Sequence, residues 1–293
     1  MMTRIALLAD IHGNLPALDR VMDDMRQFTP DHVVVAGDMV NWGPFSAEVM
    51  QVVYENRWTM IRGNNEYYCI NALAPRRPDS WAHFTMLEWL HEQLNDWHHV
   101  IAGLPDDIVL MYADAPNVHL CHGIPDDCWT GIYPDEFDDD DRVHTLLASS
   151  RAKTIFCGHT HIPLDRMVGA YHILNPGSVG VPLLGEAVSS YMILDGTSHG
   201  WHVAHHRTLP LDTSALQSVW QEKQFVERCG VAAQMVIEEF EQSRLVLHSF
   251  NTWMRALYPD EDATVEHGQA FLAIDATPYI LETYLQAKYQ YLE

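Results

Sequence analysis

Seven polar side chains that can bind metal ions stand directly after short apolar runs, where buried strands would end. They are Asp10, His12, Asp38, Asn64, His122, His159 and His161. Asp10 and His12 are two residues apart, as are His159 and His161, so on an extended segment the side chains of each pair would point the same way. Oxygen and imidazole ligands together suit Mn²⁺, Fe, Zn²⁺, Co²⁺ or Ni²⁺ better than Ca²⁺. The pattern predicts a metal site that several strands build together.

A pair of such ions would define the chemistry. Where each ion keeps an open position, a bridging water becomes hydroxide near neutral pH and can attack phosphorus in line. The sequence therefore predicts a metal-dependent hydrolase. The competing interpretation is that these residues are separate core or turn polar groups that share no site.

The elements that must position these residues alternate along the chain. Runs of the buried-strand type at 3–9, 32–36 and 58–61 enclose helical spacings at 14–28 and 44–55, and this βαβαβ order predicts parallel strands. An aromatic helical pattern covers 80–100. Shorter strand candidates follow at 108–112, 118–121, 154–157, 172–174, 191–194 and 201–205. The acidic run 138–141 fits the start of a solvated helix.

The last third of the chain has a helical residue pattern in place of the alternating one. Residues 231–258 contain no Gly or Pro and carry an apolar stripe, which predicts one long amphipathic helix. We expect a catalytic domain over 1–210, with a helical insert at about 70–104, and a helical C-terminal extension over 211–293. The apolar stripe is expected to pack against the domain, with a homo-oligomer interface through these helices as the alternative.

Composition limits the classes of partner. The chain has 293 residues, 47% of them hydrophobic, and a formal net charge of −23. That charge repels polyanions, so we expect no polymeric nucleic acid partner. Five scattered cysteines without a CxxC pair indicate a reducing compartment. No apolar run has the roughly 18 residues that a membrane span needs, and the N-terminal run does not resemble a signal peptide. We expect a cytoplasmic protein without a membrane partner.

The ordered motifs resemble a known family. Asp10-x-His12, Gly37-Asp38, Gly63-Asn64-Asn65-Glu66, His122-Gly123 and Gly158-His159-Thr160-His161 together resemble the signature of the calcineurin-like metallophosphoesterases, in their bacterial YfcE-like phosphodiesterase branch. Asn175-Pro176-Gly177-Ser178 strengthens the match, and the family pattern places its backbone near the metal site. The resemblance covers about residues 3–206. It implies an α/β fold, a four-layer α/β/β/α sandwich with the metals at the carboxyl ends of the strands.

The resemblance also implies a role for each ligand. Asp10, His12 and His161 would bind the first of two divalent ions, with manganese favoured. Asp38 would bridge both ions and act in catalysis with Asn64 and His122. Asn64, His122 and His159 would hold the second ion.

One position departs from the family pattern. The family's motif carries a histidine that protonates the leaving oxygen, and this chain has Asn65 there. An amide cannot give up a proton, and general acid catalysis is typically worth ~10²–10⁴-fold. We therefore expect slow turnover of alkoxide-like leaving groups and less effect on nucleotide, pyrophosphate or aryl leaving groups. Asn65→His is expected to raise the rate on alkyl esters.

Substrate contacts are less clearly indicated by the sequence. Arg62 precedes the Gly63 turn and would contact phosphate or form a surface ion pair. Trp42, Tyr67 and Trp129 lie beside the motifs and would stack on a base or aryl group, or simply belong to the core.

These patterns predict a dinuclear phosphoesterase, with a phosphodiesterase acting on small activated phosphates or nucleotides as the favoured reading. The alternatives are a phosphomonoesterase, including a Ser/Thr protein phosphatase, and a catalytically weak metal- and nucleotide-binding regulator.

Overall fold

Two five-stranded sheets form the centre of the molecule, which is described from a computed structural model covering residues 2–72, 85–135, 140–276 and 279. The first sheet has the order β10-β9-β1-β2-β3 and the second β4-β5-β6-β8-β7. The strands of the first sheet are β1 (Thr3–Leu8), β2 (His32–Val35), β3 (Thr59–Met60), β9 (Val188–Thr197) and β10 (Gly200–Pro210). Those of the second are β4 (Asp107–Leu110), β5 (Val118–Cys121), β6 (Thr154–Phe156), β7 (Leu164–Val168) and β8 (Tyr171–Asn175).

The parallel strands of each sheet have their carboxyl ends at the same edge. β1 pairs in parallel with β2, and β2 with β3, as the alternating pattern predicts. In the second sheet β5, β6 and β8 are also parallel. Because parallel strands end at the same edge, the residues that follow them gather there.

Helices cover the outer faces of both sheets. Over the first sheet lie α1 (Leu15–Met25), a 3₁₀ turn (Arg26–Phe28) and α2 (Ser46–Glu55), followed by α3 (Asn64–Asn71), α4 (Thr85–Gln93) and α5 (His98–Gly103). The second sheet carries α6 (Asp141–Ser149), which packs through Val143 and Leu146. The facing sides of the two sheets bury Leu7, Val34 and Phe156 in one cluster. The four-layer α/β/β/α sandwich with C-terminal helices is thus confirmed.

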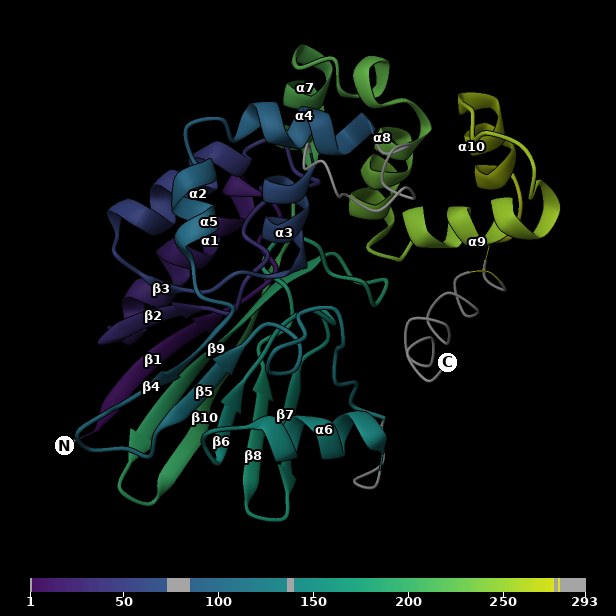
Figure 1. Ribbon diagram of the computed structural model, residues 1–293. Coiled ribbons are helices and arrows are strands. Elements are labelled where there is room, and N and C mark those ends of the chain that lie inside the picture. The colour runs from purple at the N-terminus through teal and green to yellow at the C-terminus, as the bar shows by residue number, and fades with distance from the viewer. Residues whose placement is uncertain (1, 73–84, 136–139, 277–278, 280–293) are drawn as a thin grey trace.

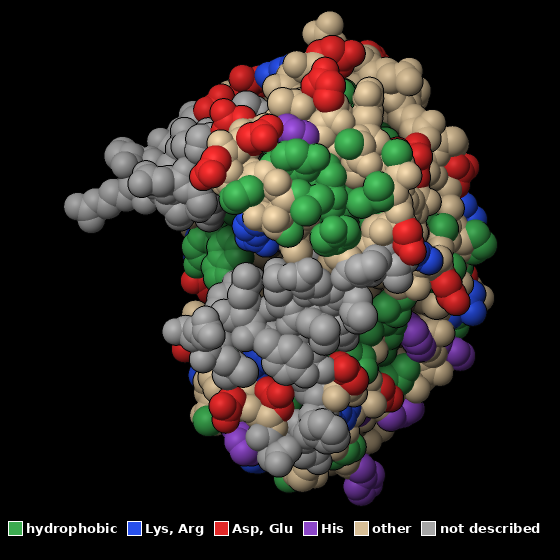
Figure 2. Space-filling view, turned by 90° about the vertical axis from the view of Figure 1, so that its right-hand side faces the viewer, with side chains coloured by type: hydrophobic (Ala, Val, Ile, Leu, Met, Phe, Trp, Pro, Cys, Tyr) green, Lys and Arg blue, Asp and Glu red, His purple; other side chains and the backbone are tan. Residues whose placement is uncertain are grey.

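The C-terminal residues form a group of helices beside α4, at the upper right in Figure 1. They are α7 (Ser214–Glu222), α8 (Phe225–Gln242), α9 (Leu247–Leu257) and α10 (Val265–Leu272). The face they present in Figure 2 gathers hydrophobic side chains with acidic ones at the rim, and Leu257 and Ile274 are among the exposed apolar residues. In the part of the chain that is described, no helix is long and apolar enough to span a membrane.

The single long helix predicted for 231–258 is wrong. Ser243 adopts a left-handed conformation with φ 53°, which ends α8, and α9 begins four residues later. The buried carboxylate of Glu239 accepts hydrogen bonds from the N–H groups of Val246 and Leu247, both at 2.9 Å. This carboxylate supplies the acceptor that the start of a new helix needs, so the two helices meet at an angle instead of continuing. The helical pattern at 80–100 is likewise divided, between α4 and α5.

Candidate metal centre

Segments that follow β1, β2, β3, β5 and β6 bring the predicted ligands together. The metal-ligating atoms of Asp10, His12 and His161 lie within 4.8 Å of one another, and so do those of Asp10, Asp38 and His122. We call the first group the first metal position and the second group the second metal position. Asp10 belongs to both. All of these side chains are buried.

Asp38, a member of the second position, also lies close to the first. Its Oδ2 atom is 3.7 Å from His12 Nε2, in the first position, and 3.3 Å from His122 Nε2, in the second. Asn64 and His159 complete the second position. Asn64 Oδ1 is 3.1 Å from His122 Nε2 and 3.0 Å from His159 Nδ1. The structure therefore brings all seven predicted ligands into one cluster.

The prediction that Asp10 and His12 lie on an extended segment is wrong. The two residues do not continue the strand in an extended conformation, because both have positive φ, 54° and 49°. Asp38, His159 and His161 also have positive φ. Such backbones cost of order 1–3 kcal/mol each and persist where the surroundings enforce them. Here the N–H groups of Ile11 and His12 both donate to the carbonyl of Asp38, at 2.8 and 3.0 Å. The ligand loops thus hold one another in this conformation.

Hydrogen bonds fix which ring nitrogen of two histidines carries a proton. His122 Nδ1 lies 2.7 Å from the carbonyl of Ala36, and His161 Nδ1 lies 2.5 Å from the carbonyl of Val181. A carbonyl only accepts, so each Nδ1 carries a hydrogen, and Nε2 is the ring nitrogen that each of these histidines turns toward the cluster. This arrangement, with the second ring nitrogen donating to a carbonyl, is the usual one for a metal-bound histidine.

The polar atoms of the cluster converge, and some of them have no hydrogen-bond partner. The Nε2 atom of His122 faces the oxygens of Asp38 and Asn64, while His161 Nε2 lies 3.1 Å from His12 Nε2. Asp10 Oδ2 and His12 Nδ1 are buried without a hydrogen-bond partner. Buried lone pairs of this kind are costly unless a cation satisfies them. The donor set therefore fits divalent metal ions.

Ionisation in the cluster agrees with this fit. Burial lowers the pKa of His12 and His159 to about 3 and that of His161 to about 4, so these imidazoles are neutral and able to bind a metal. Burial also opposes the charge of His122, but the carboxylate of Asp38 outweighs it and raises the pKa of His122 to about 9. A metal ion beside Asp38 would replace that proton.

A buried glutamate that was seen only as part of a motif ties the ligand loops together. Glu66 accepts hydrogen bonds from the N–H groups of Asp38, Met39 and Gly63 at 2.7–2.9 Å. Burial, and secondarily Asp38, raise its pKa to about 7. Asn41 is a further residue that the sequence did not single out, and its side chain donates to Asn65 Oδ1 over 2.7 Å. In the sequence, the only signal for Glu66 and Asn41 is that they stand within or beside the ligand motifs.

The turn at Asn175–Ser178 packs directly against the ligand loops. Ser178 Oγ donates to the carbonyl of Asp10 over 2.7 Å, and the side chain of Asn175 donates to the carbonyl of Gly158, also over 2.7 Å. Its backbone therefore lies next to the centre.

The predicted substrate contacts lie in different surroundings. The Arg62 guanidinium pairs with Asp106, with Nε 2.8 Å from Oδ1, which favours the ion-pair interpretation. Trp42 stacks on His12, with ring centroids 4.4 Å apart and planes at 11°, and is only 8% exposed. It therefore has little free surface for a base.

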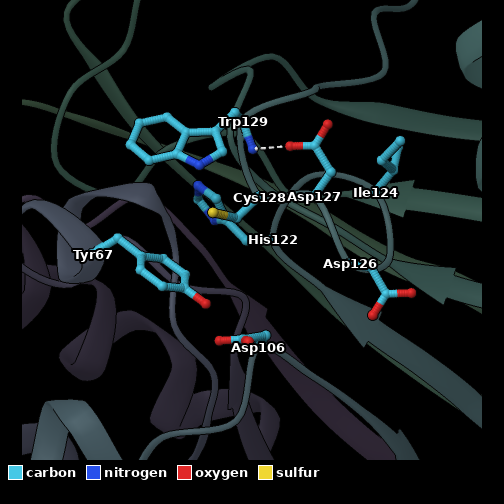
Figure 3. Close-up of a pocket in the computed structure, with 8 residues that line it drawn as sticks. All are labelled: Tyr67, Asp106, His122, Ile124, Asp126, Asp127, Cys128 and Trp129. Atoms are coloured by element: carbon cyan, nitrogen blue, oxygen red, sulfur yellow. Dashed lines mark hydrogen bonds between the residues drawn. The ribbon is translucent and has the colours of Figure 1, made fainter. Parts of the chain in front are cut away.

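A pocket of about 90 Å³ opens beside His122 (Figure 3). Tyr67 and Trp129 form two of its walls, so these two aromatic residues, unlike Trp42, face free space next to a metal ligand. Asp106 and Asp127 also line it, but Asp106 is paired with Arg62, and Asp127 accepts hydrogen bonds from Trp129 N and Thr130 Oγ1.

The sandwich and its buried Asp–His cluster define a metal-dependent hydrolase of phosphoesters. Residues 3–199 match the model of the calcineurin-like phosphoesterase superfamily domain, and the chain belongs to this superfamily, whose members depend on divalent metals. The predicted family is confirmed, and with it the prediction of an enzyme.

Individual relatives are more distant. An uncharacterized protein of Methanocaldococcus jannaschii is 26% identical over 65% of this chain and 82% of its own length. Phosphodiesterase YfcE of Escherichia coli is 25% identical over 66% of this chain and 88% of its own, in keeping with the predicted branch. The structure of a metallophosphoesterase from Sphaerobacter thermophilus is also similar, with 23% sequence identity and a TM-score of 0.60. The match covers 82% of this chain and 99% of that one. The structure of a hypothetical protein from Pyrococcus horikoshii OT3 has 18% sequence identity and a TM-score of 0.65. That match covers 81% of this chain and 97% of the other. The two structures support the fold.

Proposed function

We propose that the protein is a dinuclear phosphodiesterase acting on small activated phosphodiesters or nucleotides. The observation that carries the proposal is the position of Asp38 Oδ2 between His12 and His122, one histidine from each metal position. A carboxylate so placed can bridge two ions. When bound, the two cations supply Lewis acidity and an activated water. Manganese is our favoured ion, because the set of carboxylate, amide and imidazole ligands suits it.

The residues of the protein would orient the phosphate and exclude bulk water. Asp10, Asp38 and the four histidines would fix where the phosphate can sit, and all of these side chains except that of His159, which is partly exposed, are buried away from bulk water. The open pocket beside His122 would take one organic arm of the ester, with Tyr67 and Trp129 as stacking surfaces. Asn65 cannot supply a proton, which favours leaving groups that depart as stable anions.

The test compares two chromogenic substrates. We expect Mn²⁺-dependent hydrolysis of bis-p-nitrophenyl phosphate to exceed that of p-nitrophenyl phosphate, and Asp38→Asn to abolish both. Faster cleavage of the monoester would instead select a phosphomonoesterase. Metal-loaded protein that cleaves neither substrate but binds nucleotides would select the regulator.

Two predictions about partners concern polymeric nucleic acid and self-association. The net charge of −23 argues against polymeric nucleic acid, and binding of duplex DNA at low salt would contradict this. Self-association through the C-terminal helices is to be tested by sedimentation velocity.

A further inference from the structure

Residues of the C-terminal extension contact both loops that support the histidines of the first metal position. These residues lie beyond the region 3–199 that matches the family model. The inference below rests on the proposed metal centre and concerns what the extension does for it.

The first contact reaches His12 through Trp42. The indole N–H of Trp220, in α7, donates to the carbonyl of Trp42 over 3.2 Å, and Trp220 is almost fully buried. Trp42 in turn stacks on His12. Lys223, at the end of α7, donates to the carbonyl of Pro44 and to Gln93 Oε1. The extension therefore holds the loop at 41–44 through two of its backbone carbonyls.

This loop needs such support because its backbone is strained. Asn41 and Trp42 have φ of 76° and 67°, a region that bulky L-residues avoid. Two successive residues of this kind cost of order 1–3 kcal/mol each. The bonds from α7 act on this loop together with two from the catalytic domain, in which Asn41 N donates to Ser46 Oγ and Gly43 N donates to the carbonyl of His12.

The second contact reaches His161 through the loop that follows Val181. The carbonyl of Val181 accepts the hydrogen bond from His161 Nδ1. Four residues later, the N–H of Gly185 donates to the carbonyl of Ser243 over 2.7 Å. Ser243 is buried at the junction of α8 and α9, where Glu239 holds the start of α9. The junction thus anchors the far end of the segment that orients His161.

The extension is packed firmly enough to act as a support. Trp220 packs edge-on against Phe240 with ring centroids 5.1 Å apart, and Phe225 lies 4.5 Å from Trp89 of α4. These aromatic residues belong to the same buried cluster as the core residues of α1 and α2. Close packing of this kind transmits a displacement instead of absorbing it.

We propose that the described part of the C-terminal extension, residues 211–276, is a structural part of the metal centre and sets the affinity of the first metal position through His12 and His161. Trp220 is a positioning residue that acts through Trp42. The simpler alternative is that the extension only stabilises the fold. In that case, loss of a Trp220 contact would lower stability without a specific effect on metal binding.

The test uses the full chain with Trp220→Phe, which keeps an aromatic ring but removes the N–H donor. Trp253→Phe is the matched control, because Trp253 is also buried in the extension but packs on Phe250 and Phe271 of α9 and α10. After treatment with chelator, Mn²⁺ binding is measured by calorimetry and the Tm of the metal-free protein by circular dichroism. Lys223→Met serves as a second variant at the same loop.

We expect Trp220→Phe to weaken one Mn²⁺ binding step by ~10-fold or more, in the range seen when supports of metal ligands are lost, and to leave the other step unchanged. Lys223→Met should weaken the same step, and excess Mn²⁺ should restore hydrolysis. The proposal is overturned if the Trp220 and Trp253 variants bind Mn²⁺ as the unmodified protein does, or if both lose affinity in proportion to Tm. Protein that binds Mn²⁺ but hydrolyses no phosphoester would reject the proposed function and leave this inference standing. Protein that binds no Mn²⁺, Co²⁺ or Zn²⁺ would reject both.

Discussion

The side-chain amide of Asn65 donates a hydrogen bond to Asp38 Oδ2 over 2.6 Å, and its backbone N–H donates to Asp38 Oδ1 over 2.9 Å. The amide oxygen accepts from Asn41 at the same time. Asn65 therefore orients the carboxylate between the two metal positions, whether or not a proton donor is missing there.

Replacement of Asn65 separates these two roles. Asn65→His keeps a donor toward Asp38 and adds a nitrogen that titrates, so we expect roughly 10-fold faster cleavage of a dialkyl phosphate and little change with bis-p-nitrophenyl phosphate. Asn65→Ala loses the bond to Asp38 and should slow both substrates by ~10–100-fold. Steady-state rates with metal content determined in parallel provide the measurement. An Asn65→His variant with full metal and no gain on the dialkyl ester would remove the missing-acid explanation.

Gly63 leaves room for Asp38, and that room can be filled. A Cβ atom at residue 63 would lie 2.1 Å from Asp38 Oδ1 and 2.7 Å from its backbone nitrogen. Gly63→Ala should therefore displace the carboxylate and reduce metal affinity by ~10-fold or more. Gly103→Ala is the control, since nothing lies within 4 Å of its added Cβ. Metal analysis after gel filtration would show the difference, and equal occupancy in both variants would contradict the assigned role of Asp38.

Trp129 provides a wall of the pocket beside His122, so its loss should affect binding more than chemistry. Stacking on an aromatic side chain is worth ~1–3 kcal/mol for a base, and an aryl group should gain a comparable amount. We expect Trp129→Ala to raise KM for bis-p-nitrophenyl phosphate at least ~5-fold, with a smaller change in kcat. Ethyl p-nitrophenyl phosphate, which lacks the second ring, is the matched substrate. Equal effects on the two esters would mean that the aryl group that does not leave lies outside this pocket.

Glu239 makes stability depend on pH. Burial raises its pKa from 4.5 to about 7, while two backbone N–H groups oppose the rise. The folded state therefore holds this proton more tightly than the unfolded chain. Its contribution is fully present below pH 4.5 and is lost as pH rises through about 7, by about 3 kcal/mol at most. Glu239→Gln removes the titration, so urea unfolding should show the unmodified protein losing stability relative to the variant between pH 5 and pH 8. Parallel stability profiles would show that Glu239 does not titrate in this range.

The ligands could be predicted from the sequence because each follows a short apolar run, and parallel strands carry such residues to a common edge. Asp38 and His122 are examples, although their backbone geometry could not be predicted. The positive φ values at Asp10 and His12 depend on bonds to a loop more than twenty residues away. β7 was missed because only its two end residues, Leu164 and Val168, are buried, as befits a strand at the edge of a sheet.

The failures further along the chain have a similar cause. Nothing in the local pattern around Glu239 indicates that its carboxylate will start a second helix, because that role depends on how the chain folds back. The bond from Trp220 to Trp42 joins segments whose sequences show no relation to each other. Contacts between such distant segments are set by tertiary packing, which a local sequence pattern does not reveal.

Trp220 follows Trp42 by 178 residues, and this interval has a meaning for biosynthesis. The ribosome releases the loops that carry Asp10, His12 and Asp38 long before it makes α7. A nascent chain can pair its first strands and still lack the bond that holds Trp42 against His12. Under the role proposed for Trp220, the first metal position is completed only late in synthesis, and products that terminate before α7 are expected to bind metal there less tightly.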